Sequence, residues 1–156
     1  MSIISNCLIV VATFIFMEGV AWFTHKFVMH GLGWFLHNDH HRKDPEQFFE
    51  RNDFFFLIFA IPGIIGLFIG MQQGFSPFFW IGLGITLYGF AYFLVHDIFI
   101  HQRFRIFRNS DSIYLRAIRK AHKVHHKHLD KQDGECFGML WVPMSYFREA
   151  AASKKV

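Results

Sequence analysis

Three long apolar stretches constrain the fold of this chain more than any other feature of its sequence. They run from about Ile3 to Phe23, from Phe54 to Met71 and from Pro77 to about Ile100. Each holds roughly 18 residues or more, which at about 1.5 Å per residue covers the hydrocarbon core of a bilayer. The chain has 156 residues, 53% of them apolar, and is too short to bury that much apolar surface in a soluble core. We therefore expect an all-α, polytopic membrane helix bundle with about three to four spans.

The segments between and after these stretches carry most of the polar residues. We expect residues 24–53 and 101–156 to form a histidine-rich helical cap, and the whole chain, 1–156, to form one membrane-embedded domain. Residues 1–6 have no basic run, and no small-residue cleavage site follows the first apolar stretch, so a cleaved signal peptide is not expected.

The basic residues all lie on one side of this arrangement. Residues 1–6 and the connection 72–76 contain no Lys or Arg, and all 16 basic residues follow the first or the third apolar stretch. The positive-inside tendency then places the N-terminus outside and the cap in the cytoplasm, together with all 11 histidines. A net charge of +4 suits contact with anionic lipid headgroups, and without a recognisable nucleic-acid module we expect no nucleic-acid partner.

Ten of the eleven histidines follow one spacing pattern that occurs twice. In each copy an HxxxxH pair precedes an HxxHH triplet, and only His128 is left over. Positions i, i+3 and i+4 share one face of a helix, so each triplet presents three imidazoles together. Neutral imidazole is a common ligand of transition metals. The ten candidate ligands are His25, His30, His37, His40, His41, His96, His101, His122, His125 and His126.

The HxxxxH pairs pose a geometric problem. Five positions along a straight helix turn through about 140°, so both rings of a pair do not easily reach one ion. We expect each pair at the cytoplasmic end of a spanning helix. Its two members then either serve different metals or lie where the helix unwinds or bends.

The number of histidines indicates the kind of metal site. Ten are too many for one ion and suit two ions with four to six ligands each. A membrane zinc protease would show HExxH, which is absent, and no span carries histidines in its middle, as haem would need. Cys7 and Cys136 form no iron–sulfur pattern, so electrons for redox chemistry must come from another protein. Two irons that activate dioxygen require the fewest further assumptions.

Four carboxylates are candidates to accept the second N–H of a ligating imidazole. Asp39, Asp44 and Asp97 lie within or beside the histidine motifs, with a solvated surface position as the alternative for each. Glu18 lies in the first span, seven residues before His25 and on the same helix face. A charge there is costly, so the alternative for Glu18 is a neutral carboxyl bonded within the bundle.

An apolar substrate would reach the metals from the lipid through a groove between helices. Trp80, Phe90 and Phe93 are candidates to line it, with packing or lipid contact as the alternative for each. The short apolar segment from Phe137 to Phe147 is expected at the membrane interface, where it would cover the site.

The sequence resembles the bacterial β-carotene hydroxylases of the fatty acid hydroxylase superfamily. The repeated histidine order matches that family, as do HDIFIHQRF at 96–104 and AHKVHHKH at 121–128. The segment ECFGMLWVP at 135–143 is similar to the family's Cys-x-Phe-Gly motif but lacks the intervening residue. The resemblance extends roughly from Glu18 to Pro143.

The resemblance implies a non-haem di-iron monooxygenase of the bacterial inner membrane. It implies hydroxylation of the β-ionone ring of β-carotene at carbon 3, giving β-cryptoxanthin and zeaxanthin. Dioxygen would supply the oxygen, reduced ferredoxin with its reductase would supply electrons, and the ten motif histidines would be the iron ligands. Two alternatives remain: a related di-iron oxygenase that acts on acyl chains or sterols or forms ketocarotenoids, and a membrane metal-binding or transport protein. Transport is disfavoured because the histidines stop at one face.

Overall fold

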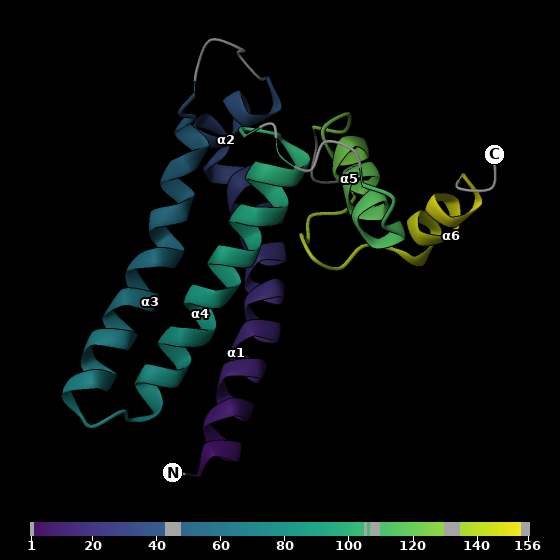
Figure 1. Ribbon diagram of the computed structural model, residues 1–156. Coiled ribbons are helices and arrows are strands. Elements are labelled where there is room, and N and C mark those ends of the chain that lie inside the picture. Colours follow the sequence, from purple (N-terminus) through teal and green to yellow (C-terminus); the bar gives the residue numbers. More distant parts are fainter. Residues whose placement is uncertain (1, 43–47, 105, 107–109, 130–134, 154–156) are drawn as a thin grey trace.

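The three apolar stretches form the long helices of the molecule (Figure 1). The computed structural model describes residues 2–42, 48–104, 106, 110–129 and 135–153. Within these ranges all regular secondary structure is helical. In chain order the elements are α1 (Ile3–Phe23), the π-helix η1 (Thr24–Leu32), α2 (Trp34–His41), the 3-10 helix η2 (Arg51–Asp53), α3 (Phe54–Gln72), α4 (Pro77–Tyr92), the π-helix η3 (Phe93–Ile100), α5 (Ile113–His125) and α6 (Met144–Ala152).

Three continuous helical stretches are long and apolar enough to cross a membrane. They are Ile3–Leu32, Arg51–Gln72 and Pro77–Ile100, with 30, 22 and 24 residues. Their outward side chains are apolar and exposed; Ile64 and Phe90, for example, are 63% and 60% exposed. Lipid accommodates such a surface and water does not. The prediction of an all-α membrane bundle is confirmed, with three candidate spans.

The hairpin of α3 and α4 depends on glycines where the two helices meet. A Cβ on Gly70 would lie 2.1 Å from the backbone nitrogen of Phe79, and one on Gly82 would lie 2.5 Å from that of Leu67. Small residues at these positions let the two backbones approach closely, as in many membrane helix pairs. Gly74 turns the chain between the helices with a φ of +68°, a conformation that glycine adopts without steric cost.

Helix α1 packs against α4 along a small apolar core. Met17, Ala21 and Tyr88 are buried there, with 6%, 7% and 3% of their surfaces exposed. A Cβ on Gly84 would lie 2.7 Å from Thr13, so this contact is also close. Together the two helix pairs place η1 and η3, which extend α1 and α4, at the same end of the bundle.

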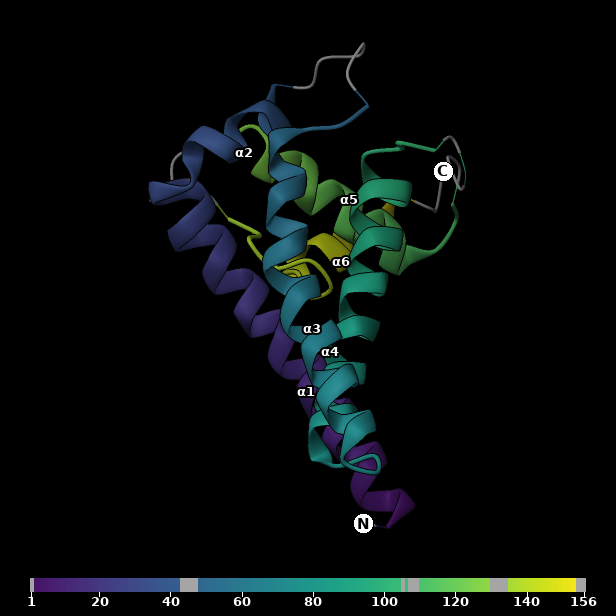
Figure 2. The same cartoon turned by 90° about the vertical axis from the view of Figure 1, so that its left-hand side faces the viewer.

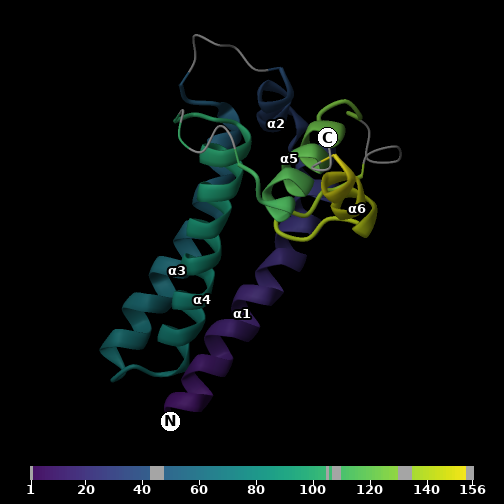
Figure 3. The ribbon, with the colours of Figure 1, turned by 45° about the vertical axis from the view of Figure 1, so that its right-hand side comes forward.

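The helices of the cap gather toward that end, away from the N-terminus (Figures 2 and 3). Helix α5 begins after Ser112, whose side chain accepts from the N–H of Leu115 and caps the helix. Its apolar face packs against α6 around Ile118 and Tyr146. His122 and His125 of the same helix are also buried, and their side chains face the bundle.

Candidate metal centre

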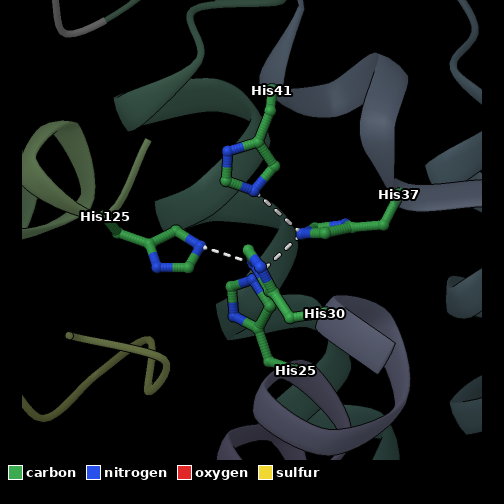
Figure 4. A group of neighbouring side chains, drawn as sticks. All are labelled: His25, His30, His37, His41 and His125. Carbon is green, nitrogen blue, oxygen red and sulfur yellow. Dashed lines mark hydrogen bonds between the residues drawn. The ribbon is translucent and has the colours of Figure 1, made fainter. Parts of the chain in front are cut away.

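Five histidines from three elements form the first histidine group. One ring nitrogen of each lies within 4.8 Å of the corresponding nitrogen of every other member. Figure 4 shows the rings pointing toward one another from η1, α2 and α5. Four of the five side chains are buried and the fifth is half-buried. The members are His25, His30, His37, His41 and His125.

A second histidine group lies beside the first. His40, His101, His122 and His126 also bring ring nitrogens within 4.8 Å of one another. His96 adjoins this group, because its Nε2 atom lies 3.0 Å from Nε2 of His40. All ten histidines of the repeated pattern therefore lie in or against one of two groups. His128, which the pattern leaves over, is exposed at the end of α5.

The π-helices explain how residues five apart serve the same group. In η1 the N–H of Gly33 donates to the carbonyl of Val28 at 2.7 Å, and in η3 the N–H of His101 donates to that of His96 at 2.8 Å. Such i→i+5 bonds widen the turn and bring positions five apart over one another. The His96 and His101 ring centroids are 4.5 Å apart as a result. We expected the two histidines of each HxxxxH pair either to serve different metals or to lie where the helix unwinds or bends. The described helices show the second arrangement, because each pair lies on a widened helix and both of its rings lie in or against the same group.

Six rings donate their Nδ1–H to an oxygen outside the groups. An oxygen acceptor at Nδ1 requires the hydrogen to be there, so Nε2 carries a lone pair. The partners are Phe137 O for His25 (3.0 Å), Leu129 O for His30 (2.8 Å), Asn52 Oδ1 for His37 (2.6 Å), Glu50 Oε2 for His40 (2.7 Å), Asp97 Oδ2 for His96 (3.3 Å) and Glu135 O for His125 (3.1 Å).

These tautomers make the groups suitable for cations. Nε2 of His25 lies 3.1 Å from Nε2 of His37, although both Nδ1 atoms are already donors. The same holds for His30 and His125 at 3.2 Å. Two lone pairs directed at each other at this distance repel, and a shared positive ion removes the repulsion. Nitrogen-only, thiolate-free donor sets with their outer N–H groups bonded are typical of transition-metal sites.

Burial keeps the cap histidines in the ligand form. Removal from water lowers the pKa of His37 to about 3 and that of His126 to about 4. Burial and the neighbouring His30 lower the pKa of His125 to about 3. These imidazoles are neutral near pH 7, as metal coordination requires.

The four carboxylates expected around the histidines lie in different surroundings. Asp97 accepts from His96, and its other oxygen lies 3.1 Å from Nε of Arg103. Asp39 accepts from the backbone N–H of Arg51 at 2.6 Å. Glu18 accepts hydrogen bonds from the Tyr88 hydroxyl and from three backbone N–H groups at 139–141. Asp44 lies outside the described residues.

Sequence reasoning missed Glu50, Asn52 and three backbone carbonyls as histidine partners. No spacing rule marks these positions, because their chain distance from the histidine they contact varies from 10 to 112 residues. Arg103 was also missed: it bonds Asp53 at 2.5 Å and lies 3.7 Å from Glu50. Arg103 therefore links the carboxylates that accept from His40 and His96.

A cavity of about 480 Å³ opens between α1, α3 and α4 and reaches the first histidine group. Most of its lining is apolar, and its wall includes His25 of the first group and His96, which adjoins the second group. Phe90 and Phe93 line it, as expected from the sequence. Trp80 does not belong to this lining; its indole N–H donates to the carbonyl of Phe75 near the α3–α4 turn. The cavity brings an apolar molecule next to the histidines.

Comparison with known proteins gives a consistent set of relatives. The profile of the fatty acid hydroxylase family matches residues 10–146. A β-carotene hydroxylase from Pseudescherichia vulneris is 40% identical over 137 residues, which are 88% of this chain and 77% of that protein. One from Paracoccus sp. (strain N81106 / MBIC 01143) is 36% identical over 89% of this chain and 85% of its own length.

A plant protein is also similar. The chloroplastic β-carotene hydroxylase 1 of Capsicum annuum is 39% identical over 81% of this chain, which corresponds to 40% of the plant sequence. No solved structure gives a significant match to the chain.

Proposed function

The chain belongs to the fatty acid hydroxylase family, and on that premise we propose that it is a membrane-bound non-haem di-iron monooxygenase that hydroxylates β-carotene. The observation that carries the proposal is the pair of adjacent histidine groups next to an apolar cavity whose wall includes His25 and His96. The names of the curated relatives supply the substrate, β-carotene.

Each histidine group has the donors to hold one iron. The first would use His25, His30, His37, His41 and His125, and the second would use His40, His101, His122 and His126 with His96 beside them. Two irons bound there would activate dioxygen, with electrons from ferredoxin and its reductase, for insertion of one oxygen atom into an unactivated C–H bond.

The chain's own residues orient and protect this chemistry. The Nδ1–H bonds to Glu50, Asn52 and the backbone carbonyls fix the rings with Nε2 toward the centre of each group. Phe137, which is 3% exposed, packs its ring against the first group and excludes water from that side. A water-poor site prevents side reactions of a strong oxidant.

The cavity suits the end of a long apolar molecule that enters from lipid. Phe56, Ile64 and Phe90 line the cavity and are also more than half exposed on the membrane face of the bundle. An apolar substrate dissolved in the bilayer therefore meets the cavity without crossing water. Hydroxylation at carbon 3 of a β-ionone ring, giving β-cryptoxanthin and then zeaxanthin, requires only that ring to reach His25 and His96.

The proposed topology puts the reaction on the cytoplasmic face of a bacterial inner membrane. The N-terminus and the α3–α4 turn lie at the end of the bundle opposite α2, which carries His37, His40 and His41 (Figure 1). Basic residues accompany the histidine end, which the positive-inside tendency assigns to the cytoplasm. Soluble ferredoxin reaches the metal groups from that side.

Expression in bacteria that accumulate β-carotene tests the proposal, with pigments identified by chromatography and mass spectrometry. The wild-type chain is expected to yield mono- and dihydroxylated carotene, and His125→Ala is expected to yield none, because it removes a nitrogen from the first group. Unchanged β-carotene in cells with well-expressed, iron-replete wild-type protein and a working ferredoxin system would contradict the substrate. Acyl lipids, sterols and keto products would then be assayed in the same cells.

A further inference from the structure

Glu18 is the one charged residue of helix α1 and accepts four hydrogen bonds. Its Oε1 atom accepts from the consecutive backbone N–H groups of Met139, Leu140 and Trp141 at 2.8, 2.9 and 3.0 Å. Its Oε2 atom accepts from the hydroxyl of Tyr88 at 2.7 Å. A carboxylate within a membrane helix is costly unless donors surround it. These four donors offset that cost, and three of them come from a segment about 120 residues further along the chain.

That segment, residues 135–142, crosses the first histidine group, and we call it the strap. The carbonyl of Glu135 accepts from Nδ1 of His125, and the carbonyl of Phe137 accepts from Nδ1 of His25. The Phe137 ring centroid lies 5.3 Å from that of His30 and 5.1 Å from that of His125. The strap thus fixes the tautomer of two rings of the group and covers a third.

Glu18 and His25, both on the first span, bind the strap at two places. His25 follows Glu18 by seven residues, which is about two helical turns, so both side chains face the strap. Glu18 binds the strap at 139–141 while His25 binds it at Phe137. Between the two carbonyls, Cys136 has a φ of +61°, a backbone conformation that residues with a side chain seldom adopt. The strap needs external bonds to keep this shape, and Glu18 supplies three of them.

We propose that Glu18 is a positioning residue that fastens the strap over the first histidine group, so that this group retains its metal. The inference rests on the proposed function only in that the ion is iron. Glu18 acts through the strap and not on the substrate. Its loss should release the ion of the first group and leave that of the second, whose described partners Glu50 and Asp97 lie on other segments.

The experiment compares purified full-length variants loaded with ferrous iron. Glu18→Ala removes the three strap bonds, whereas Glu18→Gln retains an oxygen that can accept them and an amide that can donate to Tyr88. Gly138→Ala tests the same contact from the strap side, since its Cβ would lie 2.9 Å from Oε1 of Glu18. Glu149→Ala, which removes an exposed carboxylate on α6 that pairs with Lys120, is the matched control. Helical circular dichroism and gel filtration check that each variant is folded.

Two readouts are taken: iron per chain, and hydrogen exchange of the peptide that covers 139–141. Glu18→Ala and Gly138→Ala should lose about half of the wild-type iron, and Glu18→Gln and Glu149→Ala should retain it. Loss of hydrogen bonds to a charged group should speed exchange at 139–141 in Glu18→Ala by about tenfold or more. If Glu18→Ala does not fold, the inference is tested by the iron content of Gly138→Ala, which is expected to fall to about half of the wild-type value.

Full iron content in a folded Glu18→Ala or Gly138→Ala protein would overturn the inference, and so would unchanged exchange at 139–141. Loss of nearly all the iron from a folded Glu18→Ala or Gly138→Ala protein would also overturn it, because the strap would then not act on one group alone. Failure of the proposed function looks different. In that case the wild-type chain itself binds no iron or does not convert carotene, and exchange at 139–141 still reports whether Glu18 holds the strap.

Discussion

His40 and His41 are neighbours in the sequence, but their rings belong to different histidine groups. Nε2 of His41 lies 3.1 Å from that of His37 in the first group, while Nε2 of His40 lies 3.0 Å from that of His96 beside the second. Consecutive residues on a helix point about 100° apart, so one helix can serve two adjacent centres.

The second copy of the histidine pattern makes the reciprocal exchange. His125, the fourth histidine of that copy, joins the first group, and His126 remains in the second with His122. The first group therefore contains the first, second, third and fifth histidines of the first copy and the fourth histidine of the second copy. The second group, counted together with His96, contains the first, second, third and fifth histidines of the second copy and the fourth histidine of the first copy. The two halves of the chain are connected through these exchanged rings.

The exchange predicts that removal of His40 affects the group built by the other half of the chain. We expect His40→Ala to lose the iron of the second group, so that iron per chain falls to about half and carotene conversion is abolished. His128→Ala is the matched control, because His128 is exposed and belongs to neither group. Metal analysis of both purified proteins checks this. Full iron content and activity in His40→Ala would show that the exchanged ring is not a ligand.

Glu50 accepts from His40 at 2.7 Å and should strengthen iron binding through that ring. Removing such an outer partner typically weakens metal affinity by about 10–100-fold. We expect that loss in Glu50→Ala, measured by competition with a chelator. Asp39→Ala is the control, since the Asp39 carboxylate bonds the backbone of Arg51 on the same part of the cap. Equal chelator sensitivity in the two variants would contradict the role of Glu50.

The cavity should decide access of the substrate without affecting the metals. Ala60 lines the cavity, and Ala60→Phe would fill part of it. We expect kcat/KM for β-carotene to fall by about 100-fold, as even small misplacement of a substrate can cause, with iron content unchanged. Ala12→Phe places the same ring on the exposed surface of α1 and should behave as wild type. Wild-type turnover by Ala60→Phe would place the substrate elsewhere.

The stability of the bundle should depend on the close approach of α3 and α4. A Cβ at Gly82 would lie 2.5 Å from the backbone nitrogen of Leu67, and such overpacking typically costs about 1–3 kcal/mol. We expect Gly82→Ala to lower the melting temperature in detergent. Gly19→Ala is the control, because its Cβ meets nothing within 4 Å. A melting temperature for Gly82→Ala as high as that for Gly19→Ala would mean that the helices do not approach this closely.

The spans were predictable because each is a continuous apolar run of the length that a bilayer requires. The HxxHH triplets could be placed on helices for a similar reason, since i, i+3 and i+4 share a face. The π-helices at His25–His30 and His96–His101 could be anticipated only as one of two alternatives, because spacing alone does not reveal where a helix widens.

The rest of the site depends on contacts that sequence spacing does not encode. Glu18 was expected near His25 from its place on the same helix face, but its bonds to Met139–Trp141 depend on how a distant segment folds back. Glu50 and Asn52 reach His40 and His37 because η2 packs against α2. The exchange of fourth histidines likewise follows from the tertiary packing of α2 and α5.

The source of the oxygen in the product tests the central claim most directly. Purified protein with iron, ferredoxin, its reductase and β-carotene would be supplied with dioxygen labelled with heavy oxygen, and the products analysed by mass spectrometry. We predict that each new hydroxyl group carries one labelled atom, at carbon 3 of the ring, and that labelled water contributes none. Hydroxyl oxygen derived from water, or β-carotene left unchanged by the iron-loaded protein, would contradict a dioxygen-dependent carotene hydroxylase.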